Sequence, residues 1–271
     1  MTTVLQTPYD LHLLSQAYQQ SSDLDFELRV HEYLKSVGCQ SDHGGRYLDR
    51  ITQKMREYDI LAVPPKHSLN GGTEVAPFYS TKLAIECKNV TQEFPVVVGV
   101  RPYEQELILG LRLRRDSRVE LTGYNCGINI ARMHECVARF GQDFIEHIGV
   151  EIGQVAASGK GGKTESGLYD KWSQAIHHSV VRYGEMIADI ARGSSNGDMP
   201  IWCPAVLVVP DDRLFIAVRG KSGVVVRATN GISVKVGYEF EAPFLVGHRV
   251  CISNYFVFTF TGLQRFVGMF K

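Results

Sequence analysis

The order of strand-like and helical segments constrains the fold of this chain more than any other feature. Three apolar, strand-like runs lie in the first third of the sequence, and a long helical segment precedes further strand-like runs in the last third. The strand-like runs are 46–51, 58–63, 83–90, 205–209, 214–218, 223–227 and 255–260. This order predicts a fold of the mixed α/β class rather than an all-helical or all-strand fold.

Helix signals mark two segments on either side of a long insertion. Residues 23–37 are predicted to be helical, because Ser22 or Asp23 can cap the start and Gly38 can end it. A longer helix is predicted over 168–191, where a Gly/Ser-rich stretch stops it.

We expect a single domain over 1–271. Its expected parts are a core of 21–91 and 168–218, an insertion of about 92–167 with a helix at 130–148 and an exposed glycine-rich loop at 158–167, and a β-rich tail of 219–271.

Composition and charge limit the class of protein. Apolar residues make up 44% of the sequence, which is enough for a packed core. The 29 Lys and Arg residues balance the 29 Asp and Glu residues, so any contact with nucleic acid needs a local basic patch. The six cysteines contain no Cys-x-x-Cys pair and are interpreted as free thiols. The start of the chain has no signal-like pattern and no apolar run reaches ~20 residues, so we expect a cytoplasmic protein without a membrane segment.

The segment Lys82–Asn89 carries the most informative polar residues. Alternate side chains of a strand share a face, so Glu86 and Lys88 would lie together on one face of an otherwise apolar strand. Buried charges of this kind are costly unless they pair or bind a metal. A surface or edge-strand ion pair is the alternative interpretation, because acid-x-Lys matches also arise by chance.

Two more carboxylates stand in unfavourable positions. Asp59 is the single acid of the apolar run 58–63, where aspartate disfavours a strand, unless it lies in a turn just before that strand. Glu27 falls within the apolar arc of the predicted helix, although an acid in a first turn is also favoured by the helix dipole. Together with Glu86 and Lys88, these acids predict one polar cluster.

Carboxylates beside an amine suit metal-assisted hydrolysis of phosphodiesters. Oxygen ligands hold Mg²⁺, which lowers the pKa of a bound water and neutralises charge on the phosphorus. A lysine beside the metal can orient or deprotonate the attacking water. We therefore expect Mg²⁺ as the cofactor, with Mn²⁺ able to replace it.

The order of helix Glu27, strand Asp59 and Ile85-Glu86-Cys87-Lys88 resembles the PD-(D/E)XK nuclease superfamily, which has the restriction-endonuclease-like fold. The resemblance covers about half of the chain and implies an α-β-β-β-α-β core, with a mixed central sheet flanked by helices. It implies that Asp59, Glu86 and the Cys87 carbonyl ligate the metal. It also implies that Lys88 is the catalytic amine and that Glu27 supports the metal through water. Tyr58 precedes Asp59 where the superfamily pattern has proline, a departure shared by many members.

The positive charges that could contact nucleic acid all lie in the predicted insertion. They are Arg112, Arg114, Arg115, Arg118, Lys160 and Lys163, and solvated surface charge is the alternative interpretation. On the long helix, Gln174 and His178 have the spacing of a Gln-x-x-x-Tyr motif found in some superfamily members. The apolar stripe of that helix predicts that both residues face solvent together with Lys171 and Arg182, so the motif is not assigned.

These features lead to one hypothesis and two alternatives. The hypothesis is a Mg²⁺-dependent DNA endonuclease of restriction or antiviral defence, acting on double-stranded DNA as a homodimer. Partner proteins of a defence system are a further expectation. The alternatives are a non-catalytic nucleic-acid-binding subunit of a larger assembly and an RNA-directed nuclease.

Overall fold

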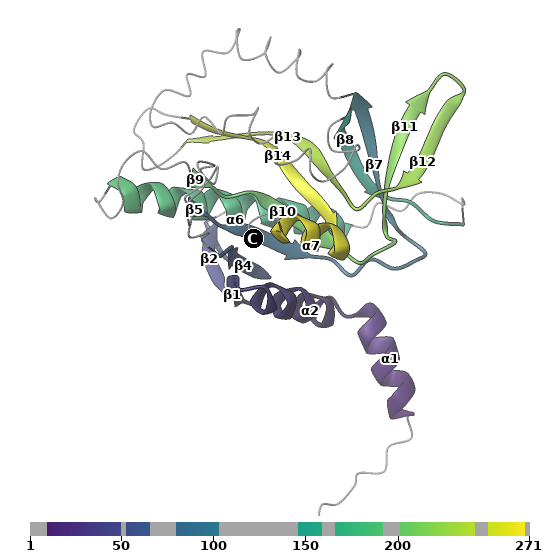
Figure 1. The fold of residues 1–271 in the computed structure, drawn as a ribbon, viewed down its shortest axis with the longest axis horizontal. Coiled ribbons are helices and arrows are strands. Elements are labelled where there is room, and N and C mark those ends of the chain that lie inside the picture. Colours follow the sequence, from purple (N-terminus) through teal and green to yellow (C-terminus); the bar gives the residue numbers. More distant parts are fainter. Residues whose placement is uncertain are drawn as a thin grey trace, which may run out of the picture.

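The structure, a computed structural model, describes residues 10–49, 53–65, 80–102, 146–158, 166–191, 201–241 and 249–268. Within these ranges the chain forms four helices and a mixed sheet of ten strands, so it belongs to the α/β class (Figure 1). The helices are α1 (Leu11–Ser21), α2 (Asp23–Ser36), α6 (Ser166–Ala191) and α7 (Phe260–Gly268). None of the helices in the described ranges is long and apolar enough to cross a membrane.

The ten strands of the large sheet are not arranged in the order of the chain. From one edge to the other they are β1 (Gln40–His43), β4 (Ile60–Val63), β6 (Leu83–Cys87), β10 (Ala205–Val209), β14 (Arg249–Thr259), β13 (Gly231–Glu241), β8 (His147–Gln154), β7 (Val96–Pro102), β11 (Leu214–Gly220) and β12 (Gly223–Ala228). Two small sheets pair β2 (Arg46–Asp49) with β3 (Lys54–Glu57) and β5 (Ser80–Thr81) with β9 (Ile201–Trp202).

One end of the sheet is a meander followed by a crossover. Strands β1, β4 and β6 are antiparallel neighbours, and β10 then lies parallel to β6. Helix α6 precedes β10 in the chain and packs against both β6 and β10. A parallel pair needs a long connection of this kind, because a tight turn can join only antiparallel neighbours.

Helices cover both faces of this end of the sheet. Helix α2 and helix α7 pack against the side chains of Ile85, Val206 and Phe258 in one core. Helix α6 packs on the other face, where Leu207 and Tyr255 belong to a second core. The alternation of side chains along β6 therefore directs Ile85 towards α2 and its neighbour Glu86 towards α6.

Several predicted elements differ from the structure. The run 46–51 was predicted as a strand of the core, but its described part forms β2 in the separate β2–β3 hairpin, which contacts α6. The edge position of the large sheet is taken by β1, a polar segment with no apolar alternation. The helix predicted over 130–148 is wrong at 147–148, which begin strand β8, while 130–145 lie outside the described residues.

The predicted insertion and tail both contribute strands to the large sheet. Strands β7 and β8 come from the part predicted as an insertion, and β12, β13 and β14 come from the predicted tail. Strand β14 lies directly beside β10, so the tail supplies an interior strand rather than an appendage. The predicted helix over 168–191 is confirmed as α6, and most of the predicted loop 158–167 lies outside the described residues.

Candidate functional site

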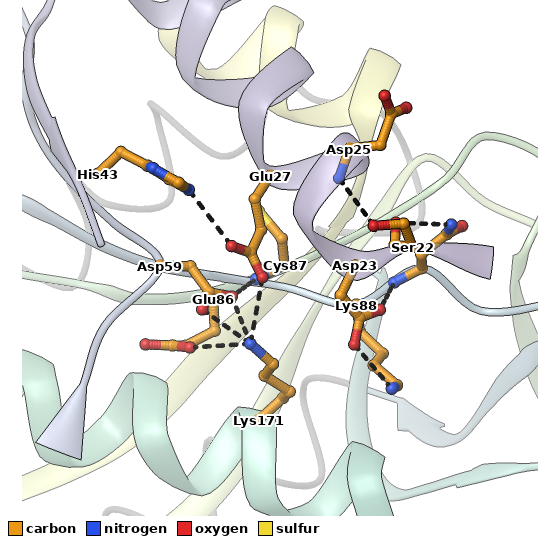
Figure 2. Close-up of polar contacts among 11 residues, drawn as sticks. Ser22, Asp23, Asp25, Glu27, His43, Asp59, Glu86, Cys87, Lys88 and Lys171 are labelled. Carbon is orange, nitrogen blue, oxygen red and sulfur yellow. Dashed lines mark hydrogen bonds and ion pairs between the residues drawn. The ribbon is translucent and has the colours of Figure 1, made fainter. Parts of the chain in front are cut away.

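Three acids predicted from the sequence meet around one lysine (Figure 2). Glu27 comes from α2, Asp59 from the bend just before β4, and Glu86 from β6. The Nζ atom of Lys171, on α6, lies 2.7 Å from both carboxylate oxygens of Asp59. The same atom lies 3.5 Å from Glu27 Oε1 and 3.6 Å from Glu86 Oε2. We call Glu27, Asp59 and Glu86 the acidic cluster.

Glu86 is the most deeply buried member of the acidic cluster. Its exposed fraction is 0%, and neither carboxylate oxygen accepts a hydrogen bond from an N–H or hydroxyl donor of the described residues. Burial and the negative charge of Asp59 raise the pKa of Glu86 well above its ordinary value, while Lys171 opposes that shift. A buried carboxylate without hydrogen-bond donors is costly to keep ionised unless a cation accompanies it.

Asp59 is held in place by the neighbouring strand. Its Oδ2 accepts a hydrogen bond from the backbone N–H of Cys87 at 2.7 Å, and its own carbonyl accepts one from Gly44 at 3.0 Å. These bonds fix the bend before β4, so that the Asp59 carboxylate points at Lys171 (Figure 2). The turn position considered for Asp59 is therefore compatible with a place in the cluster.

Glu27 joins the cluster from the partly buried side of α2. Its neighbours on that side, Phe26 and Val30, pack into the core, and its carboxylate lies 3.3 Å from His43 Nε2 on β1. Burial raises the pKa of Glu27, the charge of Asp59 adds to the rise, and the positive partners reduce it. His43 was not identified from the sequence, because it lies in a polar segment without strand periodicity.

Lys171 carries the positive charge of the site. Burial alone would lower the pKa of its ammonium group, but the charges of Asp59 and Glu86 outweigh burial and raise it. The ammonium therefore stays protonated at neutral pH and partly compensates the three acids. The apolar stripe of α6 predicts that Lys171 faces solvent, and this prediction is wrong, since its side chain is only 18% exposed.

Lys88, predicted as the catalytic amine, lies beside the acidic cluster but contacts a different acid. Its Nζ is 3.0 Å from Asp23 Oδ2, and the next residue, Asn89, donates its backbone N–H to Asp23 Oδ1 at 2.8 Å. These contacts fasten the end of β6 to the first turn of α2 (Figure 2). Among the described residues, Lys171 is the lysine at ion-pair distance from all three acids, while Lys88 as the catalytic amine stays a prediction.

His178 lies on the face of α6 that the sequence predicts to be in solvent, and this prediction is wrong. The exposed fraction of His178 is 0%, and its ring stacks on those of Tyr47 and Tyr58 with centroid distances of 5.3 and 4.3 Å. Burial, assisted by the charge of Arg182, lowers the pKa of His178 to about 3. The β2–β3 hairpin covers this face, and nothing in the helical periodicity of α6 indicates that cover.

The donor set fits a hard divalent cation, although the described side chains do not form a ready-made cage. Among residues in the described ranges, no three His, Cys, Asp or Glu side chains are grouped at metal-holding spacing, and an ammonium lies between the carboxylates instead. The three carboxylates supply the oxygen ligands that Mg²⁺ prefers, and none of the described residues donates a hydrogen bond to Glu86. A divalent cation would compete with Lys171 for the same oxygens.

The structure says less about the remaining predicted site residues, which are Cys87 and the basic residues of the predicted insertion. Cys87 contacts the site through its N–H, and its carbonyl as a metal ligand stays a prediction. The predicted nucleic-acid contacts Arg112, Arg114, Arg115, Arg118, Lys160 and Lys163 lie outside the described residues. The chain matches no family model, no curated protein and no solved structure.

Proposed function

We propose that this chain is a Mg²⁺-dependent DNA endonuclease that hydrolyses phosphodiester bonds. The observation that carries the proposal is the convergence of three acids, distant in sequence, on one amine near one end of the large sheet. Burial makes these charges expensive, so their retention favours a chemical role. The proposal includes double-stranded DNA as the substrate, a homodimer with one site per strand, and a place in restriction or antiviral defence.

The order of elements around the acidic cluster supports a restriction-endonuclease-like core. Helix α2 is followed by the antiparallel strands β1, β4 and β6, then by α6, and then by β10 parallel to β6. With the intervening strands β2, β3, β5, β7, β8 and β9 left out, this selection is compatible with the α-β-β-β-α-β order that the sequence resemblance implies, with β1 in place of the predicted first strand. Fold order alone does not define function, so the proposal depends on the site.

Each residue of the site has a role that follows from its position. Asp59, Glu86 and Glu27 would hold Mg²⁺, which when bound supplies an acidic water and charge neutralisation at the phosphate. The Cys87 N–H fixes the Asp59 carboxylate, and His43 supports Glu27. Lys171 carries a proton at Nζ beside the carboxylates and can stabilise negative charge that develops on the phosphate oxygens. Lys88, paired with Asp23, is the second amine within the same region.

One observation favours a second candidate function. Lys171 pairs with all three acids, as expected if they and the lysine form a purely structural ion cluster. The chain would then be a non-catalytic nucleic-acid-binding subunit of a larger assembly. Metal binding separates the two candidates, because a structural cluster has no need to exchange its ammonium for a divalent cation.

The test combines cleavage with metal binding. Wild-type protein is incubated with supercoiled plasmid and with matched DNA and RNA oligonucleotides, in Mg²⁺ or Mn²⁺, beside Asp59→Asn. Asp170→Asn, an exposed acid next to Lys171, is the matched control. We expect Asp59→Asn to lower the rate by at least about 100-fold and to abolish Mg²⁺ binding in calorimetry, with Asp170→Asn unchanged.

Three results would contradict the proposal. Intact plasmid and oligonucleotides with wild-type protein would exclude autonomous nuclease activity. Absence of metal binding, or binding unchanged by Asp59→Asn, would favour the non-catalytic subunit. Cleavage of RNA but not of matched DNA would replace the DNA nuclease with an RNA-directed one.

A further inference from the structure

A two-stranded ribbon ends the large sheet opposite the acidic cluster. Strands β11 and β12 are antiparallel, and a turn at Lys221 and Ser222 joins them between Gly220 and Gly223. Figure 1 shows this ribbon standing out at one end of the sheet. Every residue of β12 is exposed, and β12 is an edge strand. Gly223 has a φ of +128°, a conformation that L side chains rarely adopt, so the tight turn depends on glycine.

The ribbon is basic, and its nearest acids in the sequence are Asp211 and Asp212 before β11 and Glu239 in β13. The stretch 213–238 contains no Asp or Glu but five positive residues, Arg213, Arg219, Lys221, Arg227 and Lys235. Arg219, Lys221 and Arg227 are exposed. This segment is locally cationic in a chain whose total charge is zero, so the charge is concentrated rather than dispersed.

Strand register places the positive side chains on both faces of the ribbon. Arg219 lies opposite Val224, whereas Arg227 lies opposite Ile216. Directly opposed residues share a face and successive residues alternate, so Arg219 and Arg227 lie on different faces, with Lys221 at the tip. Strand β7 runs parallel to β11 and pairs with it from Leu214 to Val218, so Arg219 lies beyond the paired part of β11.

The ribbon also exposes apolar side chains. Val224, Val225 and Val226 are 64%, 57% and 55% exposed, and none of the three belongs to a core of the described residues. A purely solvated edge strand is expected to carry polar residues, because an exposed apolar edge invites association. Val224 and Val226 share a face with Arg219, and Val225 shares a face with Arg227. Each face therefore offers a cation beside apolar methyl groups, which suits a partner with both negative and apolar groups.

We propose that the β11–β12 ribbon enters the major groove of duplex DNA. The major groove of B-DNA is about 12 Å wide and admits a two-stranded β-ribbon, with phosphates on both walls and thymine methyl groups on the floor. The A-form major groove of duplex RNA is too narrow for such a ribbon. The inference rests on the proposed function in taking duplex DNA as the substrate, and it assigns the surface that grips it.

The ribbon, proposed to bind DNA, lies far from the acidic cluster, proposed to cleave it. Seven strand spacings lie between β6 and β12 in the sheet order, on the order of 30 Å along the sheet. One turn of B-DNA is about 34 Å long, so a duplex held by the ribbon could reach the acidic cluster about one turn away. The ribbon therefore binds the duplex, while the acidic cluster acts on its backbone.

The test measures binding without cleavage. Full-length protein is titrated in EDTA against a fluorescent DNA duplex, over a range of salt concentrations. The ribbon variant Arg219→Ala/Lys221→Ala/Arg227→Ala is compared with Lys35→Ala/Lys54→Ala/Arg265→Ala, which removes three exposed positive charges elsewhere. We expect the ribbon variant to bind at least about tenfold more weakly, with a salt slope reduced by about 2 to 3, and the control to change less than about threefold.

A second variant protects the test against misfolding. Lys221→Glu changes only the exposed turn, and we expect it to weaken duplex binding while thermal unfolding stays unchanged. Equal binding by the ribbon variant and the control would overturn the inference, as would a wild-type protein that does not bind duplex DNA. Equal competition by duplex RNA would overturn the choice of DNA.

Other binding partners of the ribbon would give different results in these experiments. Binding to vesicles that contain phosphatidylserine, without binding to duplex DNA, would replace the groove with a membrane surface. A self-association in sedimentation that Lys221→Glu abolishes, with DNA affinity unchanged, would assign the ribbon to a second copy of the chain. Ribbon-dependent DNA binding without Mg²⁺-dependent cleavage would overturn the proposed function and leave this inference standing, and the reverse pattern would do the opposite.

Discussion

The two ends of the large sheet differ in whether their charged side chains are buried or exposed. At the β1–β4–β6–β10 end, helices cover both faces and the charges of the acidic cluster are buried against Lys171. At the β12 end, the strand is exposed along its whole length, including its charged residue Arg227. Buried charges are fixed in position and perturbed in pKa, which suits chemistry, whereas exposed charges suit contact with a large partner.

The largest expected effect distinguishes the two lysines at the buried end. Lys171→Met is expected to slow Mg²⁺-dependent cleavage by about 10²- to 10³-fold, because it removes the positive charge that would stabilise the phosphate oxygens. Lys88→Met, which removes a contact to Asp23, is expected to slow it by less than about tenfold. Single-turnover cleavage of a DNA oligonucleotide measures both rates.

Folding must be controlled in this comparison, since Lys171→Met leaves three acids without their cation. Lys171→Arg keeps the charge and serves as the second variant, with circular dichroism melts for each protein. A larger loss in Lys88→Met than in folded Lys171 variants would return the catalytic amine to Lys88 and contradict the assignment made from geometry.

The next comparison concerns valines at the two ends. Val208 on β10 is 0% exposed and Val225 on β12 is 57% exposed. Val208→Ala removes buried methyl groups and is expected to cost about 2 kcal/mol of unfolding free energy, whereas Val225→Ala is expected to cost less than about 0.5 kcal/mol. Urea unfolding measures both. Equal losses would mean that the ribbon is packed in solution and not a free surface.

A smaller effect follows from the raised pKa of Glu86. A carboxyl whose pKa is raised by folding favours the native state at low pH, and this contribution is lost as the pH rises through its native pKa. Glu86→Gln cannot ionise, so its melting temperature should exceed that of the wild type by a few degrees near pH 8 and by less near pH 4. The exposed Glu32→Gln is the matched control. A variant that is less stable than the wild type near pH 8 would show that the Glu86–Lys171 ion pair outweighs the cost of burial.

An effect of similar size concerns His178. Its pKa is lowered from 6.5 to about 3, so its contribution to stability is present above about pH 6.5 and is lost as the pH falls towards the native pKa. His178→Phe keeps an aromatic ring between Tyr47 and Tyr58 but cannot be protonated. We expect its stability to fall less than that of the wild type between about pH 7 and pH 5, by about 1 to 2 kcal/mol. Thermal melts measure this, with the exposed His12→Phe as the control. If the melting temperatures of the wild type and His178→Phe fall equally as the pH is lowered, this role of His178 is contradicted.

The acids of the site could be predicted because each breaks a pattern. Glu86 is the only charged residue of β6, and Asp59 stands directly before an apolar strand. Glu27 interrupts the buried side of α2 next to Phe26. A polar residue that interrupts a hydrophobic periodicity can be recognised from the sequence alone, because the periodicity depends only on the local geometry of a helix or strand.

Lys171 and the first strand could not be predicted in the same way. Helix α6 has an apolar stripe, and periodicity assigns everything opposite that stripe to solvent. The β2–β3 hairpin covers another face of the helix, and this cover depends on tertiary contacts such as the stack of Tyr47 on His178. Strand β1 is polar because it is an edge strand, so its sequence carries little strand signal.

The contacts of Lys171 have a consequence for the motion of the long helix. One nitrogen atom joins α6 to α2, to the start of β4 and to β6. Any event that draws the carboxylates away from this nitrogen also releases charged contacts between the helix and the sheet. Amide hydrogens in the first turns of α6 would then exchange faster with deuterated solvent, so the chemical state of the acids could be read from the backbone of a helix of 26 residues.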